Sequence, residues 1–148
     1  MDGITLHNCF VAPLLRITPD MLNRVLSDVI AANAVLIADL NRKQLAAGIR
    51  ADNSAISPYY RPDTVQIKRD KGQRTDRVTL HDTGDFYESI FTAVFDQAFD
   101  LEATDPKTEE LKAKYGDDIL GLTPENRAVL IEVIKPQFID LLKKEIAL

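Results

Sequence analysis

The same helix-start signal occurs near both ends of the chain, and it predicts two long helices. Thr18-Pro19-Asp20 and Thr123-Pro124-Glu125 each combine a capping side chain, a proline suited to the first helical position and an early acid. After each signal, apolar residues recur at three- and four-residue steps, as on one face of an amphipathic helix. The first segment is rich in alanine, so we expect one helix from Thr18 as far as Ala47, before Gly48.

The C-terminal helix is expected to begin at Pro124 and to be kinked at Pro136. A proline inside a helix removes one backbone donor, and its ring clashes with the preceding turn. The apolar stripe of this helix comprises Val129, Leu130, Val133, Ile134, Phe138, Leu141, Leu142 and Ile146.

The middle of the chain has a mixed pattern. Short strands are expected at 64–68 and 78–80, and residues 107–115 are expected to form a short helix stopped by Gly116. Residues 85–103 are ambiguous: β-branched and aromatic residues favour one helical turn followed by a hairpin, and a single helix remains the alternative. The predicted fold is therefore α+β, with the long N-terminal helix and the kinked C-terminal helix packed on a small antiparallel sheet.

Length and charge limit the classes of protein. A chain of 148 residues has the size of one domain, so we expect 1–148 to be a single domain with residues 1–17 as an N-terminal arm. The net charge of −5 disfavours nucleic-acid binding through one dominant basic face. No apolar run has the length of a bilayer span, and no signal peptide is evident, so we expect a cytoplasmic protein without a membrane partner.

Few residues could carry metal or covalent chemistry. One cysteine, Cys9, and two histidines, His7 and His81, do not provide the usual ligands of a structural zinc site. Cys9 lies among apolar residues and is expected to be buried. The glycines are scattered and form no phosphate-binding loop. We therefore expect no cofactor, no metal and no catalytic residue.

The turn Asp82-Thr83-Gly84 allows two interpretations. It is similar to the active-site loop of retroviral-type aspartic proteases, in which two such loops supply carboxylates that share a proton. Asp85 follows where those proteases place a small residue, and two strong helices stand where an all-β fold is required. The favoured interpretation is a structural turn, in which Asp82 caps the next helical turn and Gly84 supplies a positive φ.

A basic segment stands out from the acidic background. Residues 61–77 contain six basic and three acidic residues, a local charge of +3. We expect a mobile charged loop here, with a docking function for its basic side chains as the alternative. The candidate docking residues are Arg61, Lys68, Arg69, Lys71, Arg74 and Arg77.

The order of short motifs resembles a family of bacteriophage proteins. The chain combines a long N-terminal helix, the segment 56–60 with Ser57-Pro58, and the basic segment, followed by Thr83-Gly84, Phe86, Ser89-Ile90 and a late helix after a proline. In this order it resembles the neck, tail-completion and virion-morphogenesis proteins of tailed phages, the small connectors at the head-tail junction.

The resemblance implies a virion structural protein without catalysis. Such a protein is expected to assemble with copies of itself into a ring, six-fold in this interpretation, beside adjacent neck or tail-tube proteins. DNA would be a passing cargo only, and the protein would occupy the host cytoplasm during assembly and the virion afterwards. Two alternatives stay open: a cytoplasmic helical interaction or regulatory module, and, more remotely, an aspartic protease that uses Asp82.

Overall fold

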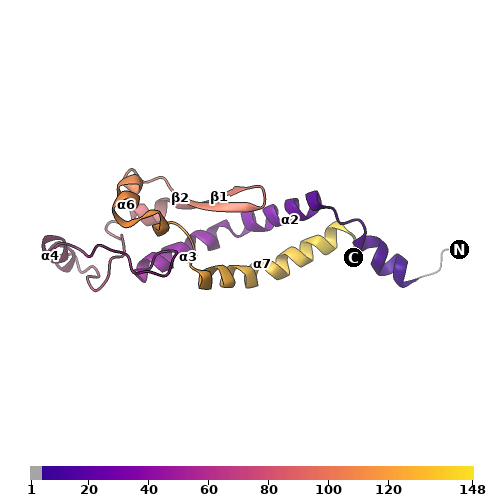
Figure 1. Cartoon of the computed structure of the whole chain (residues 1–148), viewed down its shortest axis with the longest axis horizontal. Coiled ribbons are helices and arrows are strands. Elements are labelled where there is room, and N and C mark those ends of the chain that lie inside the picture. The colour runs from indigo at the N-terminus through magenta and orange to yellow at the C-terminus, as the bar shows by residue number, and fades with distance from the viewer. Residues whose placement is uncertain (1–4) are drawn as a thin grey trace.

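The chain is an elongated α+β molecule. The computed structural model describes residues 5–148, of which most are helical and few are in strands. Two helices, α2 (Pro19–Ala32) and α3 (Ala34–Ala46), run through the middle of the rod. A hairpin of β1 (Ile90–Phe95) and β2 (Ala98–Ala103) lies along one side, and α7 (Pro124–Glu145) lies along the other (Figure 1).

The predicted single N-terminal helix is divided into α2 and α3 at Asn33. Thr18 caps α2 as expected, because its hydroxyl accepts a hydrogen bond from the Met21 amide at 3.2 Å. The two helices meet at an angle of 56°. At the bend, the Asn33 side-chain amide donates to the Val29 carbonyl at 2.8 Å and to the Gln137 side chain of α7 at 2.7 Å. The expectation of one continuous helix over 18–47 is therefore wrong, and a bond to a distant helix marks the break.

Residues 85–103 form a helical turn followed by a hairpin, as the favoured interpretation predicted. The turn is α5 (Asp85–Ser89), and β1 pairs antiparallel with β2 from Ile90 opposite Ala103 to Phe95 opposite Ala98. α3 packs against β1, whereas α7 packs mainly along α2. Within the described residues these two strands form the whole sheet.

Two other predicted strands are not strands. Residues 64–68 belong to the helix α4 (Pro62–Asp70), which lies at the end of the rod far from the N-terminus. Pro62 occupies the first turn of α4, and the Gln66 side chain donates to Asp70 one turn later. These two helix-favouring features outweigh the strand preference of the β-branched pair Thr64-Val65. Residues 78–80 form no strand, and Leu80 has a φ of +58°, which lies outside the extended region.

The N-terminal arm predicted for residues 1–17 is helical over residues 7–14. A π-helical segment, η1 (His7–Val11), leads directly into α1 (Ala12–Leu14). In η1 the Ala12 amide donates to the His7 carbonyl five residues earlier, which is the hydrogen bond of a π-helix. The next residue, Pro13, has no N–H to donate. Cys9 is exposed, so the prediction that it is buried is wrong. Residues 1–4 of the predicted arm lie outside the described residues.

Polar side chains of α3 hold the start of α7. The Gln44 side chain accepts from the Thr123 amide at 2.9 Å and donates to the Gly121 carbonyl at 3.1 Å. The Asn41 amide donates to the Ile119 carbonyl at 3.0 Å, at the end of the 3-10 turn η2 (Asp117–Ile119) that follows α6 (Thr108–Tyr115). α7 then begins at Pro124 as predicted and continues across Pro136.

Buried apolar residues form two neighbouring clusters, and α3 contributes to both. The hairpin cluster contains Ala38, Leu45, Ile56, Val78, Phe86, Ile90, Tyr115 and Ile119. The groove cluster contains Ile30, Ile37, Leu40, Leu122 and Leu130. Within residues 5–148 no single helix has both the length and the apolar composition of a membrane span, and α2 with α3 reaches them only as a bent pair.

Candidate functional site

The turn Asp82-Thr83-Gly84 forms a junction between α4 and α5. Gly84 has a φ of +94° and occupies the position before α5, as predicted for a glycine in a left-handed turn. Thr83 accepts a hydrogen bond from the Asp85 amide at 3.3 Å. The Asp82 carboxylate binds Lys71 at 2.9 Å and Gln73 at 3.3 Å instead of capping α5. The prediction of an Asp82 cap is therefore wrong, and this side chain fastens the segment after α4 to the turn.

The geometry around Asp82 differs from that of a proteolytic site. The hydrogen bond from Lys71, with that from Gln73, keeps the pKa of Asp82 below its usual value. A protease dyad needs two carboxylates that share one proton, whereas this carboxylate is paired with a lysine. The mainly helical body also lacks the all-β architecture of that enzyme class.

The motif on which the resemblance to phage proteins is based is a folding junction in this chain. Phe86 and Ile90 are buried in the hairpin cluster, with 6% and 2% of their surfaces exposed. Ser89 ends α5, and its hydroxyl donates to the Phe86 carbonyl at 2.8 Å. Phe86, Ser89 and Ile90 thus lie where the chain changes from helix to hairpin, so their role here is structural.

The first part of the basic segment is a helix, so the prediction of a loop over 61–77 is wrong for residues 62–70. Nine of its residues form α4, and Lys68 is buried with only 7% exposed. The Lys68 amine lies 4.8 Å from the centre of the Tyr60 ring and donates to the His81 carbonyl at 2.8 Å. Lys68 therefore holds α4 against the turn and is unsuited to docking a partner.

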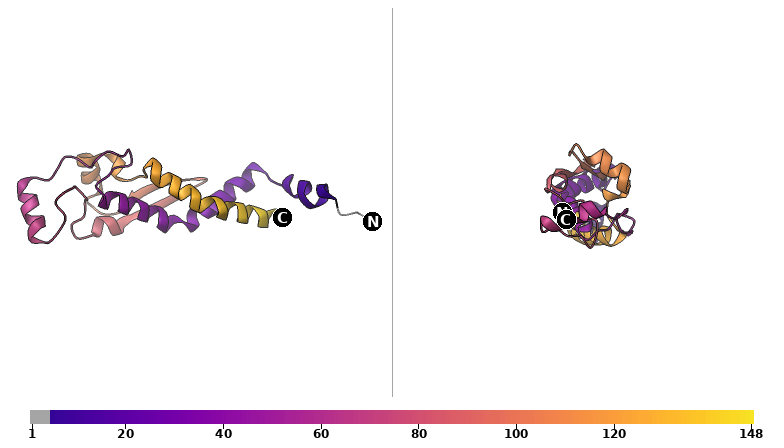
Figure 2. Two further views of the ribbon diagram at one scale, coloured as in Figure 1. Left: turned by 90° about the horizontal axis from the view of Figure 1, so that it is seen from below. Right: turned by 90° about the vertical axis from the view of Figure 1, so that its left-hand side faces the viewer.

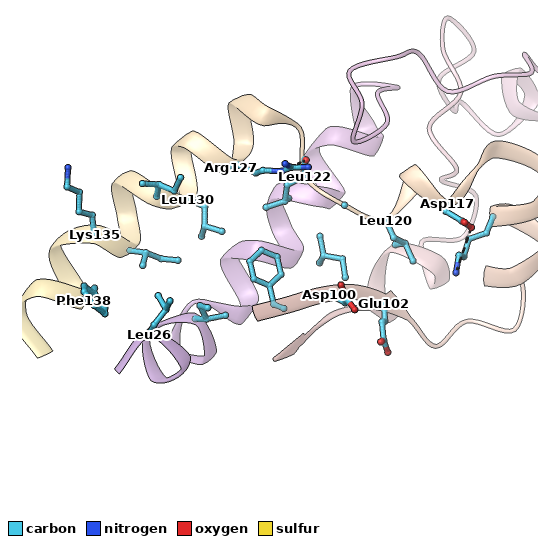
Figure 3. A pocket seen from close by; sticks show the side chains of 17 residues that line it. Leu26, Asp100, Glu102, Asp117, Leu120, Leu122, Arg127, Leu130, Lys135 and Phe138 are labelled. Atoms are coloured by element: carbon cyan, nitrogen blue, oxygen red, sulfur yellow. Dashed lines mark hydrogen bonds and ion pairs between the residues drawn. The ribbon is translucent and has the colours of Figure 1, made fainter. Parts of the chain in front are cut away.

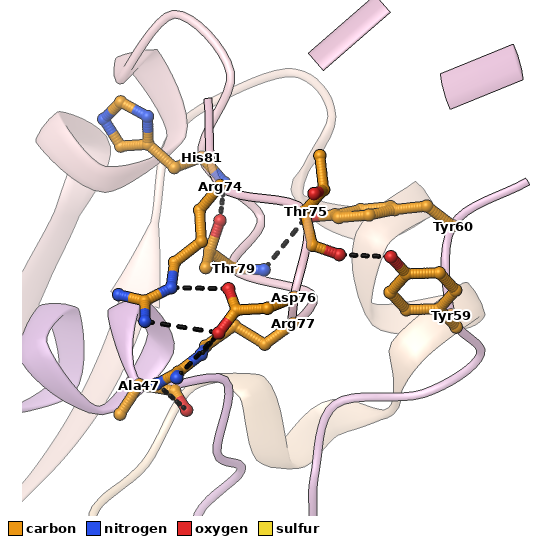
Figure 4. Close-up of polar contacts among 9 residues, drawn as sticks. All are labelled: Ala47, Tyr59, Tyr60, Arg74, Thr75, Asp76, Arg77, Thr79 and His81. Carbon is orange, nitrogen blue, oxygen red and sulfur yellow. Dashed lines mark hydrogen bonds and ion pairs between the residues drawn. The ribbon is translucent and has the colours of Figure 1, made fainter. Parts of the chain in front are cut away.

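Three more of the candidate docking residues bind acids within the chain. Lys71 pairs with Asp82, whereas Arg74 and Arg77 both bind the Asp76 carboxylate, at 2.6 Å and 2.9 Å (Figure 4). Arg61 and Arg69 are exposed and form no ion pair within residues 5–148. Within the described residues, these two arginines are therefore the candidate docking residues without an acidic partner, whereas Lys71, Arg74 and Arg77 are accessible to solvent but already paired.

The pairing at Asp76 predicts a defined pH dependence. Hydrogen bonds from Arg74 and then Arg77 lower the pKa of Asp76 to about 2, from an unfolded value of about 3.9. The folded pKa is depressed, so the stabilisation is complete above about pH 4 and is lost as the pH falls towards 2. Thermal melts from pH 2 to 7 are expected to show a higher melting temperature for wild type than for Asp76→Asn near neutral pH, with the difference shrinking below pH 4. A difference that stays constant across this range would contradict the prediction.

A groove between α7, α2 and β2 is the main candidate binding site. It has a volume of about 950 Å³, and Figure 3 shows its walls formed by α7 on one side and the hairpin on the other, with α2 between them. Its apolar lining comprises Leu26, Ile30, Phe99, Leu101, Leu120, Leu122, Leu130, Ile131, Ile134 and Phe138. Acidic and basic side chains surround this apolar floor. Such a surface can bind a peptide segment or a helix.

Sequence reasoning identified the apolar stripe of α7 and missed the groove. Within that stripe Leu130 and Ile146 are buried, whereas Ile139 is absent from it and is exposed. Ile131, on the groove wall, has 58% of its surface exposed and also falls outside the predicted stripe. The C-terminal helix has more apolar residues than one buried face needs, and this excess could have indicated a second contact surface on α7.

A second, smaller pocket of about 410 Å³ lies beside the Asp82 turn. Its lining includes Tyr60, Lys68, His81 and Lys107 together with the turn itself. Among the residues that the structure describes, no three His, Cys, Asp or Glu side chains gather where they could hold a metal ion. Comparison of the chain with protein-family models, with curated proteins and with solved structures gives no significant match.

Proposed function

We propose that this chain is a virion structural subunit of the phage neck or tail-completion type, which assembles with copies of itself into a ring. The observation that carries the proposal is the amount of apolar surface left exposed at the arm and along α7, including Leu6, Phe10, Leu15, Ile131 and Ile139. Large exposed apolar surfaces mark interaction sites, and the subunits of assemblies bury such side chains against their neighbours.

The elongated form and the phage-like motif support the same proposal. A thin rod with an arm at one end and α4 at the other can contact neighbours on both sides of a ring (Figure 2). The motif at Thr83-Gly84 and Ser89-Ile90 serves the fold, as expected where function resides in surfaces between subunits. Six-fold closure, contacts with adjacent neck or tail-tube proteins and a place in the virion are the further parts of the proposal.

Native mass spectrometry and negative-stain microscopy of the purified chain test this function. We expect a closed ring with a whole number of copies, six in the favoured case. A chain that remains monomeric at tens of micromolar would contradict the proposal. That result would favour the alternative, a helical interaction or regulatory module, because the groove of about 950 Å³ could then bind a helix of another protein.

A further inference from the structure

The arm presents an apolar helix to solvent. Leu6, Phe10 and Leu15 have 86%, 55% and 74% of their surfaces exposed. Residues 5–15 contain no lysine, arginine, aspartate or glutamate. The segment formed by η1 and α1 projects past the C-terminal end of α7, at the end of the rod (Figures 1 and 2). It has the composition of a segment that is buried against another surface.

The charges around the groove balance one another, which suits an uncharged apolar partner. The rim of the groove carries three acidic and three basic side chains: Asp100, Glu102, Asp117, Lys112, Arg127 and Lys135. A charged partner would therefore gain little net attraction there. An uncharged partner would leave these rim groups in water and would bury only the apolar floor.

The groove and the arm also match in size and form. A volume of about 950 Å³ equals that of roughly 30 water molecules at about 30 Å³ each, which is room for several side chains. Leu6, Phe10 and Leu14 are spaced four residues apart, close to one helical turn. Apolar anchors at such spacing are how a short helix binds in an apolar groove.

The connection to α2 directs the arm away from the groove of its own chain. Thr18 caps α2 at the point where the arm leaves it, and Arg16 donates to the Ile146 carbonyl at 3.4 Å. The Arg16 bond joins the base of the arm to the end of the body, and the arm continues outward from there (Figure 2). A neighbouring copy can receive the arm without a reversal of the chain.

We infer that the arm of one copy docks in the groove of the next copy, so that each subunit donates one arm and accepts another. This inference rests on the proposed ring and names the contact that closes it. The contact joins two different surfaces, so a chain of such contacts closes into a ring when the rotation between copies is suitable.

Variants on each half of the contact test the inference. Leu6→Asp places a charge on the arm, and Ile131→Asp places one on the groove wall at a side chain that is 58% exposed. The matched control is Val129→Asp, on the same helix, 49% exposed and outside the groove lining. By native mass spectrometry we expect both test variants to be monomers and the control to assemble like wild type. Circular dichroism checks that each variant is folded, and Leu6→Asp lies outside the body and leaves its core unchanged.

Mixing the two test variants provides the decisive measurement. Leu6→Asp retains an intact groove and Ile131→Asp retains an intact arm, so an equimolar mixture can form one contact and should give a 1:1 heterodimer. A mixture of monomers would overturn the inference, as would test variants that assemble like wild type. In the latter case the proposed ring would stand and only its contact would be wrong. A wild-type chain that is monomeric would overturn both, and open filaments that the variants abolish would support the contact while contradicting the ring.

Discussion

Truncation of Ile37 to alanine is expected to cost about 2–5 kcal/mol of folding free energy. Ile37 has none of its surface exposed and lies in the groove cluster, between the hairpin side and α7. The loss combines the transfer free energy of the removed methyl and methylene groups with the cost of the cavity that remains. In a chain of this size, each kcal/mol corresponds to roughly 2–4 °C in melting temperature.

Val35→Ala provides the matched control for this experiment. Val35 lies on the same helix two residues earlier, with 74% of its surface exposed, and its truncation should change stability by less than about 0.5 kcal/mol. Urea denaturation of both variants and wild type gives the free energies and the m-values. Equal stabilities for Ile37→Ala and Val35→Ala would show that α3 does not pack as described.

Replacement of Gly84 by valine is expected to destabilise the fold by about 1–3 kcal/mol. The φ of +94° is accessible to glycine, whereas a β-branched residue is strained there. A Cβ atom at this position would lie 3.4 Å from Nε2 of His81, which is an ordinary van der Waals contact, so the backbone strain is the main cost. This strain acts on the turn that directs Phe86 and Ile90 into the core.

Gly84→Asn separates backbone strain from crowding. Asparagine tolerates the left-handed region better than valine, so its loss of stability should be smaller, although its Cβ atom meets the same histidine. Thermal and urea denaturation should rank the three proteins as wild type, Gly84→Asn and Gly84→Val in order of decreasing stability. Losses of equal size for the two variants would assign the effect to crowding, and no loss for either would contradict the role of the turn.

The elements that the sequence predicted correctly are those with local signals. Thr18 and Thr123 cap their helices with their own side chains, and Gly84 and Gly116 have the positive φ that their turns require. The hairpin followed from the β-branched and aromatic residues after Ser89. In each case the decisive interaction joins residues a few positions apart, so it can be identified in one sequence.

The elements that were missed depend on distant residues. The bend at Asn33 involves a bond to Gln137, more than 100 residues away, and an alanine-rich sequence does not indicate it. Lys68 is buried because Tyr60 and the His81 carbonyl surround its amine, which composition cannot show. The groove is likewise formed where α2, β2 and α7 meet, so only the tertiary structure identifies it.

The position of α3 in both buried clusters has a consequence for how the molecule opens. Ala38 and Leu45 belong to the hairpin cluster, and Ile37 and Leu40 belong to the groove cluster. Because both clusters pack against α3, unfolding of α3 would disrupt both clusters at once. The body should therefore behave as one cooperative unit, with the slowest amide hydrogen exchange along α3. The arm shares none of these buried residues, so it can rearrange to meet a neighbour while the rest of the subunit stays folded.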